Sequence, residues 1–319
     1  MLKKENTIIV IPPAGTYQKK LYDAISAKGY AVFPSMQGGR NVIYRFIRSY
    51  SMKYNLRIQK CVYGDWKNVD LKKIEVILFF HDKYSYLLIK YLRRKLLYKG
   101  KIYLYYMDPI RTSGAIDCRK IDIKAEILSN DIDVFSFEKR DCEEYGFKFN
   151  TLFFFKEDIK GCLKHETDVF FIGTDKNRLQ ALLKIKEILD ELGIKSDIHI
   201  CKYNGRASKY GKSIGYKYSK YISYEQLLEK VLSTKCVLDI VPENQEEVTL
   251  RVYEALFYKK KIITNNSNVK QYAFYSPHNI FIWGVDNISG LKDFIYGKFD
   301  ESLQKEIDEL DFDKWLRRF

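Results

Sequence analysis

The sequence predicts an α/β protein made of two domains, and three observations lead to this prediction. Short apolar runs of strand length alternate with longer stretches in which apolar residues recur at helical spacing. The chain has 319 residues, which exceeds the length at which one hydrophobic core usually keeps growing. Hydrophobic residues make up 46% of the sequence, which is enough for two cores.

The N-terminal half begins with a strand, a helix and a second strand, and further strands follow. Strands are predicted at 7–11, 30–33, 76–80, 101–107, 133–137 and 151–155, and helices at 17–28 and 84–97. Residues 156–167 are polar and lack a long apolar run, so they form the predicted linker. We therefore expect an N-terminal domain over residues 1–155.

The C-terminal half contains two similar strand, loop and helix runs. The first has an apolar strand at 168–172, a polar turn at 173–178 and a helix that ends at Gly193. The second has a strand at 236–241, a polar loop, a helix at 248–261 and the start of another strand. These runs predict a C-terminal domain over 168–300, followed by an amphipathic helix over 301–319.

The turn at 173–178 is suited to an anionic ligand. In an open α/β sheet, ligands lie outside the carboxyl ends of the strands, where helix N-termini offer free backbone N–H groups. This turn combines Gly173 and Thr174 with the cations Lys176 and Arg178. The turn lacks the known glycine-rich phosphate patterns, so a solvated turn is the alternative interpretation.

The helix of the second run carries a second candidate pair. Arg251 and Glu254 fall on neighbouring positions of one helical face, close to the helix start near Thr249. Such a pair can hold a phosphate and a ribose diol. An ordinary salt bridge on a solvated helix face is the alternative.

The second run resembles the donor-binding half of GT-B glycosyltransferases of bacterial capsular polysaccharide and lipopolysaccharide biosynthesis. The matching residues are Cys236 to Asp239, Gln245, Thr249, Arg251, Glu254 to Leu256, Lys260, Lys261 and Thr264 to Asn266. The resemblance implies two Rossmann-like domains facing across a cleft, with the last helix packed on the N-terminal domain. It also implies a nucleotide-sugar donor of the UDP, GDP or CMP type, bound by the C-terminal domain, and an acceptor bound by the N-terminal domain.

The N-terminal half resembles the same family and supplies the candidate catalytic residues. Segments 105–110 and 134–146 carry this resemblance. Asp108 follows the strand at 101–107, and His81 and Asp82 follow the strand at 76–80, so all three end neighbouring strands. Asp108 is our first choice as the base that activates the acceptor hydroxyl, and a turn Asp before Pro109 is the alternative.

One departure from the family pattern concerns the loop after Gln245. The members of the family that this segment resembles have a small residue there, whereas this chain has Glu246 and Glu247. Two carboxylates beside a diphosphate would repel it. The departure raises a second hypothesis, in which the chain is a catalytically impaired GT-B partner subunit.

The charge indicates an anionic partner, because 55 Lys and Arg against 41 Asp and Glu give a net charge of +14. Residues 40–60 read as a basic, aromatic helix suited to an anionic membrane surface, and 86–100 and 314–319 are weaker candidates. Residues 202–221 mix cations, Tyr and Gly. A basic nucleic-acid-binding protein is therefore the rival hypothesis, although no nucleic-acid motif is present and we expect no such partner.

Metal and thiol chemistry find little support in the sequence. The six cysteines are scattered, and the Asp-x-Asp triplets at 131–133 and 311–313 follow no convincing strand. We expect no obligatory metal or cofactor. The apolar run near the N-terminus is too short for a membrane span, so we expect a cytoplasmic protein attached peripherally to the inner face of the membrane.

We therefore expect a glycosyltransferase that moves a hexose-type sugar from a nucleotide-sugar donor to a polysaccharide or lipid-linked oligosaccharide. Its partners would be the donor, the glycan acceptor, the membrane surface and further glycosyltransferases. The candidate donor-binding residues are Gly173, Thr174, Lys176, Arg178, Gln245, Thr249, Arg251 and Glu254, and the catalytic candidates are Asp108, His81 and Asp82.

Overall fold

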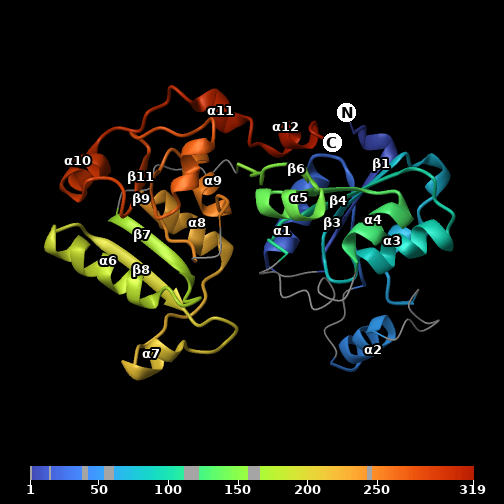
Figure 1. The fold of residues 1–319 in the computed structure, drawn as a ribbon, viewed down its shortest axis with the longest axis horizontal. Coiled ribbons are helices and arrows are strands. Elements are labelled where there is room, and N and C mark those ends of the chain that lie inside the picture. The colour runs from blue at the N-terminus through green and yellow to red at the C-terminus, as the bar shows by residue number, and fades with distance from the viewer. Residues whose placement is uncertain are drawn as a thin grey trace. The chain divides into compact units, whose positions relative to one another are not determined.

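The computed structural model describes residues 2–13, 16–37, 42–53, 61–110, 122–156, 166–242 and 246–319. The chain forms two compact units, which Figure 1 draws as ribbons. One unit comprises Met1–Thr151 with Leu316–Phe319, and the other comprises Leu152–Trp315. Most of the predicted linker, residues 157–165, lies outside the described residues.

The N-terminal unit is built on a parallel sheet of six strands in the order β2-β1-β3-β4-β5-β6. The strands are β1 Thr7–Ile11, β2 Ala31–Pro34, β3 Val76–Phe80, β4 Lys101–Tyr106, β5 Asp133–Ser136 and β6 Lys148–Phe149. The helices are α1 Thr16–Ala27, α2 Val42–Lys53, α3 Ser85–Arg94, α4 Ile123–Asn130 and α5 Lys139–Tyr145. All five residues of β1 are buried, as expected for a parallel strand covered on both faces.

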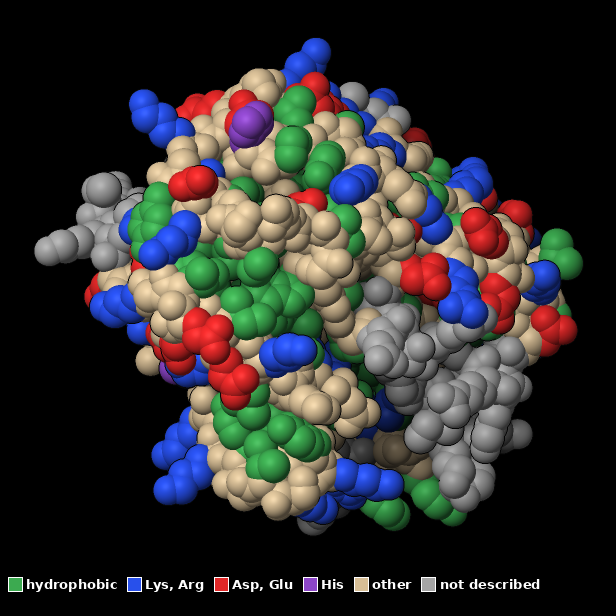
Figure 2. Space-filling model, turned by 60° about the vertical axis from the view of Figure 1, so that its left-hand side comes forward, with side chains coloured by type: hydrophobic (Ala, Val, Ile, Leu, Met, Phe, Trp, Pro, Cys, Tyr) green, Lys and Arg blue, Asp and Glu red, His purple; other side chains and the backbone are tan. Residues whose placement is uncertain are grey.

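The C-terminal unit contains a parallel sheet of five strands in the order β11-β10-β9-β7-β8. The strands are β7 Thr167–Thr174, β8 Ser196–Cys201, β9 Thr234–Asp239, β10 Lys261–Thr264 and β11 Ile280–Ile282. The helices are α6 Leu179–Glu191, α7 Lys209–Ser213, α8 Tyr224–Leu232, α9 Leu250–Phe257, α10 Leu291–Tyr296, α11 Gln304–Asp308 and α12 Phe312–Leu316, the last of which reaches the boundary between the units. Segment 202–221 leaves this sheet after β8, and Figure 2 shows basic and hydrophobic side chains side by side at the lower end of the face, where Figure 1 places α7.

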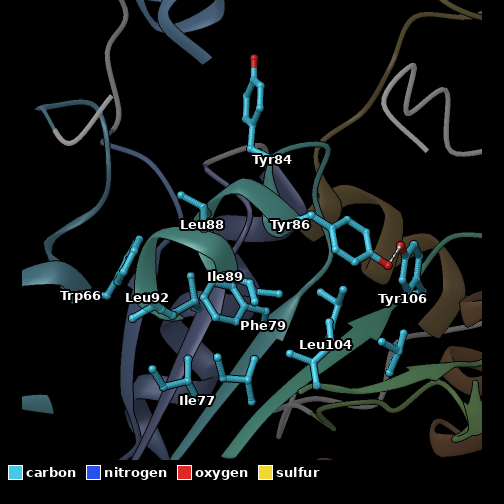
Figure 3. Packing of buried hydrophobic residues seen from close by; sticks show 14 of the residues in the cluster. Trp66, Ile77, Phe79, Tyr84, Tyr86, Leu88, Ile89, Leu92, Leu104 and Tyr106 are labelled. Carbon is cyan, nitrogen blue, oxygen red and sulfur yellow. Dashed lines mark hydrogen bonds between the residues drawn. The ribbon is translucent and has the colours of Figure 1, made fainter. Parts of the chain in front are cut away.

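Each unit has its own hydrophobic core. In the N-terminal unit, alternate residues of β1, β3 and β4 pack against the apolar face of α3, as Figure 3 shows for Ile77, Phe79 and Leu104 beneath Ile89 and Leu92. In the C-terminal unit, alternate residues of β7 and β9 pack against α6 and α10. The period of two along each strand supplies one core face, and the period of 3.6 along each helix supplies the other.

Three predicted elements differ in the structure. The helix predicted over 248–261 ends at Phe257, and Lys261 begins β10. Residues 151–155 were expected to form a strand, but Phe154 makes only an isolated bridge to Asp311. The aromatic run is buried by ring packing instead, with Phe153 against Phe312 and Trp315. The same bridge interrupts segment 301–319, which forms the two short helices α11 and α12 where we expected a single helix.

Candidate functional site

Helix α9 begins beside the carboxyl ends of β7 and β9, and its first residues come from the sequence run that resembles a donor site. Thr249 is the N-cap, and its hydroxyl oxygen accepts a hydrogen bond of 3.2 Å from the backbone N–H of Arg251. The helix therefore starts at the predicted position. It presents its free N–H groups and the positive end of its dipole at this edge of the sheet.

Arg251 and Glu254 form the predicted pair within this helix. Arg251 Nε lies 3.6 Å from Glu254 Oε2, and Arg251 Nη2 donates a hydrogen bond of 3.3 Å to the Ile172 carbonyl of β7. The Glu254 side chain is only 4% exposed, and that of Arg251 is 19% exposed. The pair is thus not a salt bridge on a solvated face, which was the alternative interpretation.

Arg178 reaches the same edge from the turn after β7. Its Nε donates a hydrogen bond of 2.9 Å to the Thr174 carbonyl, and its Nη1 donates one to the Ile240 carbonyl just after β9. Burial lowers the pKa of this guanidinium, which nevertheless stays protonated because arginine titrates far above neutral pH. Gly173 makes room for the group, since a Cβ at this position would lie 2.6 Å from Arg178 Nη2.

Asp239 completes the arrangement, although we did not predict it as a site residue. It is the last residue of β9 and is buried. Burial raises its pKa, while a hydrogen bond with Thr249 and the charges of Arg251 and Arg178 oppose the increase. The signal in the sequence was an acidic residue within the apolar run at 236–241, three residues before the polar loop.

We call Arg178, Asp239, Arg251 and Glu254 the Arg–acid cluster. Three of its buried polar atoms have no hydrogen-bond partner in the described part of the protein: Asp239 Oδ2, Arg251 Nη1 and Glu254 Oε2. A buried polar atom without a partner costs about 1–3 kcal/mol. One unpaired donor and two unpaired acceptors at the carboxyl edge of a parallel sheet fit a ligand that combines anionic oxygens with hydroxyl groups.

The rest of the predicted turn has a different role. Asp175 is buried, and its Oδ1 accepts a hydrogen bond of 3.1 Å from the Leu179 backbone N–H, which caps α6. Its Oδ2 accepts one of 2.5 Å from the Tyr218 hydroxyl of segment 202–221. Lys176 is exposed, and its ammonium group lies 5.7 Å from the ring centre of Tyr203 in the same segment. Arg178 is thus part of the Arg–acid cluster, whereas Lys176 contacts segment 202–221.

The loop before α9 carries the two carboxylates, Glu246 and Glu247, that would repel a diphosphate lying beside them. Gln245 lies outside the described residues. Glu247 is buried and accepts a hydrogen bond from the Tyr272 hydroxyl. The carbonyl of Glu246 accepts hydrogen bonds from Asn266 Nδ2 at 2.9 Å and from Asn268 Nδ2 at 3.1 Å. The Glu247 carboxylate is therefore engaged within its own unit.

The N-terminal candidates end neighbouring strands, as expected. Burial lowers the pKa of His81 to about 3, so this imidazole is neutral at pH 7, and it stacks on Tyr106 with ring centres 3.9 Å apart. Burial raises the pKa of Asp82, whose oxygens accept hydrogen bonds from the Ser35 hydroxyl at 2.5 Å and the Tyr84 backbone N–H at 2.8 Å. Asp108 is exposed two residues after β4.

The described ranges contain neither a metal site nor a membrane-spanning helix. No group of three or more His, Cys, Asp or Glu side chains in those ranges is arranged to hold a metal ion. Among the described helices, none is long and apolar enough to cross a membrane.

Comparisons with known proteins concern the fold. No protein-family model matches the chain, and no curated protein sequence matches it. Among solved structures, TarM matches with a TM-score of 0.53 and 15% identity over 80% of this chain. This chain covers 55% of the TarM chain, little more than half of its length.

A second solved structure covers nearly the whole chain. It is an alpha-glucosyltransferase in complex with UDP and a 13-mer DNA containing an HMU base, and it matches with a TM-score of 0.51 and 12% identity. The match covers 97% of this chain and 94% of the other. At such identities the likeness is one of fold. The chain has the α/β fold of two Rossmann-like domains that characterises GT-B proteins, as the sequence predicted.

Proposed function

We propose that the protein is a glycosyltransferase that uses a nucleotide-sugar donor. The observation that carries this proposal is the Arg–acid cluster, in which two arginines and two buried carboxylates meet at the N-terminus of α9. Glycosyl transfer from such a donor leaves a nucleoside diphosphate, whose developing charge must be stabilised. Arg251, Arg178 and the start of α9 would perform this task, and Glu254 would accept hydrogen bonds from the donor ribose.

The acceptor hydroxyl needs a base, and Asp108 remains the best candidate of the three. His81 is a weak base because its pKa is about 3. The carboxylate oxygens of Asp82 are engaged by Ser35 and by the start of α3. Asp108 is exposed at the carboxyl edge of the N-terminal sheet. Replacement of Asp108 by Asn should abolish sugar transfer and spare nucleotide binding, and unchanged transfer would remove Asp108 as the base.

UDP is the first nucleotide to test, because one solved structure of this fold contains it. We further propose that the acceptor belongs to bacterial surface glycan synthesis, as the sequence resemblance implies. An impaired partner subunit is less well supported, because one of the two carboxylates that suggested it, that of Glu247, is buried against Tyr272.

Peripheral attachment to a membrane is a further part of the proposal, and it rests on α2. Among the three predicted membrane candidates, the segments around α3 and α12 bury most of their apolar residues, including Leu88, Leu92 and Trp315, although Leu97 after α3 is exposed. Helix α2 instead exposes Phe46, Ile47 and Tyr50. Exposed aromatic and aliphatic side chains on a basic helix are typical of insertion at a membrane interface.

The test of the donor site is thermal unfolding of the purified protein with UDP, GDP, CDP, CMP and their sugar conjugates. A ligand at about a hundred times its dissociation constant stabilises a protein by ~2.7 kcal/mol. We expect a selective increase in melting temperature that Arg251→Ala and Glu254→Ala reduce. The exposed Lys292→Ala of the same unit is the control and should retain it.

Two outcomes of this experiment would count against the proposal. The first is no increase with any nucleotide, and the second is an equal increase in the wild type and in Arg251→Ala. Because the arginines supply the positive charge, we also expect the increase in melting temperature with nucleotide to persist in EDTA. Its loss in EDTA would contradict the expectation that no metal is required.

A further inference from the structure

Segment 202–221, between β8 and α8, carries positive charge without any acidic residue. Its cations are Lys202, Arg206, Lys209, Lys212, Lys217 and Lys220, and all six are exposed. It also contains five tyrosines, of which Tyr203, Tyr210 and Tyr221 are exposed by 43%, 39% and 65%. The Arg–acid cluster does not explain these exposed cations and tyrosines, because its residues come from other segments.

The segment has a defined conformation. Ser208 caps α7 by accepting a hydrogen bond of 3.0 Å from the Gly211 backbone N–H. The Ser219 backbone N–H donates a hydrogen bond of 2.8 Å to the Ile200 carbonyl of β8, and Tyr216 and Tyr218 pack against the core. The packed tyrosines hold the segment, and the three exposed ones alternate with cations along the sequence. Figure 2 shows green and blue side chains side by side at the lower end of this face.

The segment is joined to the turn after β7. Tyr218 donates a hydrogen bond of 2.5 Å to Asp175 Oδ2, and Lys176 lies over the ring of Tyr203. Arg178, three residues after Asp175, belongs to the Arg–acid cluster. A molecule bound on the segment therefore lies beside the turn that supplies Arg178.

We propose that segment 202–221 binds part of the acceptor, and that this acceptor is an anionic glycan chain. This inference rests on the proposed glycosyltransferase function. Six cations without a carboxylate complement a ligand with repeated negative charges, and the exposed phenol rings offer flat faces on which sugar rings pack. An acceptor must also lie near the donor, which the contacts with Asp175 and Lys176 provide.

The test uses the full-length protein and three polymer probes. Dextran sulfate is the anionic glycan, dextran is the neutral chain with the same backbone, and oligothymidylate is the nucleic acid. We expect dextran sulfate to bind with an affinity that falls as salt rises, and dextran to bind much more weakly. Tighter binding of oligothymidylate than of dextran sulfate, or no binding of dextran sulfate, would overturn the inference.

Matched variants locate the surface. Lys209→Ala/Lys212→Ala removes two cations of the segment, and Lys292→Ala/Lys298→Ala removes two exposed cations at α10 and just beyond it. If each exposed contact contributes about 0.2–1 kcal/mol, the first double variant should weaken dextran sulfate binding about 2- to 30-fold. The second should leave it nearly unchanged, and an equal loss in both would overturn the inference. Tyr210→Ala should also weaken binding.

Thermal stabilisation by UDP, measured on the same proteins, separates this inference from the proposed function. Retained stabilisation in Lys209→Ala/Lys212→Ala, together with weaker glycan binding, supports a distinct acceptor surface. Lost stabilisation in that variant would overturn it. An absence of UDP stabilisation in the wild type would overturn the proposed function, whereas intact UDP stabilisation without dextran sulfate binding would overturn only this inference.

Discussion

At the scale of single residues, the two arginines of the Arg–acid cluster are held in different ways. Arg178 donates hydrogen bonds to two backbone carbonyls, and its guanidinium lies 5.2 Å from the ring centre of Phe171. Arg251 has one backbone acceptor at 3.3 Å, and its buried Nη1 has no hydrogen-bond partner among the described residues. Arg178 therefore positions the end of β7 as well as carrying charge, while Arg251 is the better donor to a ligand.

The first prediction concerns Arg178→Lys. A lysine keeps the charge but cannot make the forked contacts to Thr174 and Ile240. We expect the free energy of unfolding, measured by urea denaturation, to fall by about 1–3 kcal/mol. Arg206→Lys, at an exposed position of the same unit, is the control and should change it little. Equal values for both variants would show that the contacts of Arg178 contribute no stability.

The second prediction concerns the pH dependence of stability at Asp175. Burial alone would raise the pKa of this carboxyl group, but hydrogen bonds from Ser208, Tyr218 and the Leu179 backbone N–H lower it below its ordinary value. A lowered folded pKa stabilises the protein above the unfolded pKa of about 3.9, and this stabilisation is lost as the pH falls through the folded pKa.

We therefore expect Asp175→Asn to lower the free energy of unfolding at pH 7 by about 1–2 kcal/mol. The difference from the wild type should shrink as the pH falls below about 4. Urea denaturation across this range measures it, with the exposed Asp190→Asn as the control. A difference that stays constant from pH 7 to pH 3 would contradict this account of Asp175.

Three of the four cluster residues could be predicted from the sequence, and the reason the fourth was missed is physical. Arg178 stands in a turn and Arg251 and Glu254 in a helix, where local spacing together with the family resemblance indicated an anion site. The role of Asp239 depends on burial and on Arg178 and Arg251 approaching from two other segments. Lys260 and Lys261 make the same point. The predicted helix over 248–261 would have ended at these two lysines, but both lie beyond α9, are buried and donate to the carbonyls of Leu232 and Phe294.

At the scale of elements, the last residues of β7 pack directly against the side chain of Arg178. Gly173 has no Cβ, and an added one would come within 2.6 Å of Arg178 Nη2 and 3.0 Å of Phe171 Cζ. The close approach of strand and guanidinium therefore requires glycine at this position. Because the guanidinium is the end of a flexible side chain, we expect it to move away when a methyl group is added.

The third prediction is that Gly173→Ala weakens UDP binding by about tenfold and lowers the free energy of unfolding by about 1–3 kcal/mol, because the displaced guanidinium loses its contacts with Thr174 and Ile240. Calorimetric titration and urea denaturation measure the two quantities. Gly290→Ala is the matched control, because a Cβ there would meet nothing within 4 Å. Unchanged UDP affinity in Gly173→Ala would mean that Arg178 does not contact the nucleotide.

The fourth prediction concerns α2 and the membrane. Phe46 is 68% exposed and stacks on Tyr50 with ring centres 5.9 Å apart, and Ile47 lies beside them. We expect the protein to sediment with vesicles that contain anionic lipid and much less with neutral vesicles. Phe46→Ala/Ile47→Ala should reduce this binding by roughly tenfold or more, because burying an apolar side chain contributes about 1.5–3 kcal/mol.

Leu128→Ala is the control for α2, since Leu128 is 82% exposed on α4 of the same unit. The Leu128→Ala variant should bind anionic vesicles as well as the wild type does. If both variants lose binding to the same extent, α2 is not the membrane-binding element.

The elements themselves were largely predictable, and the exceptions share a cause. Strand β3 occupies 76–80 as expected, and β1 and α3 differ from prediction by a few residues at most. The aromatic run at 151–155 has the composition of a strand, yet its rings are buried by Phe312, Trp315 and Phe257 from distant parts of the sequence. Local composition cannot distinguish an aromatic side chain that is buried in a β-sheet from one that is buried by aromatic residues distant in the sequence.

At the scale of the whole molecule, the two units have separate hydrophobic cores. Leu104 of β4 and Leu182 of α6 are fully buried in different clusters. Units of this size with their own cores usually unfold independently. The proposed donor site lies entirely within the C-terminal unit, so a nucleotide should stabilise only that unit.

The fifth prediction is that calorimetry resolves two unfolding transitions, of which UDP raises only one. Leu182→Ala should lower the transition that responds to UDP, and Leu104→Ala should lower the other, each by the equivalent of about 2–5 kcal/mol. The two variants are controls for each other, because each leaves one core intact. A single cooperative transition that both variants lower equally would show that the units unfold as one. A UDP effect on the transition lowered by Leu104→Ala would instead assign the nucleotide site to the N-terminal unit.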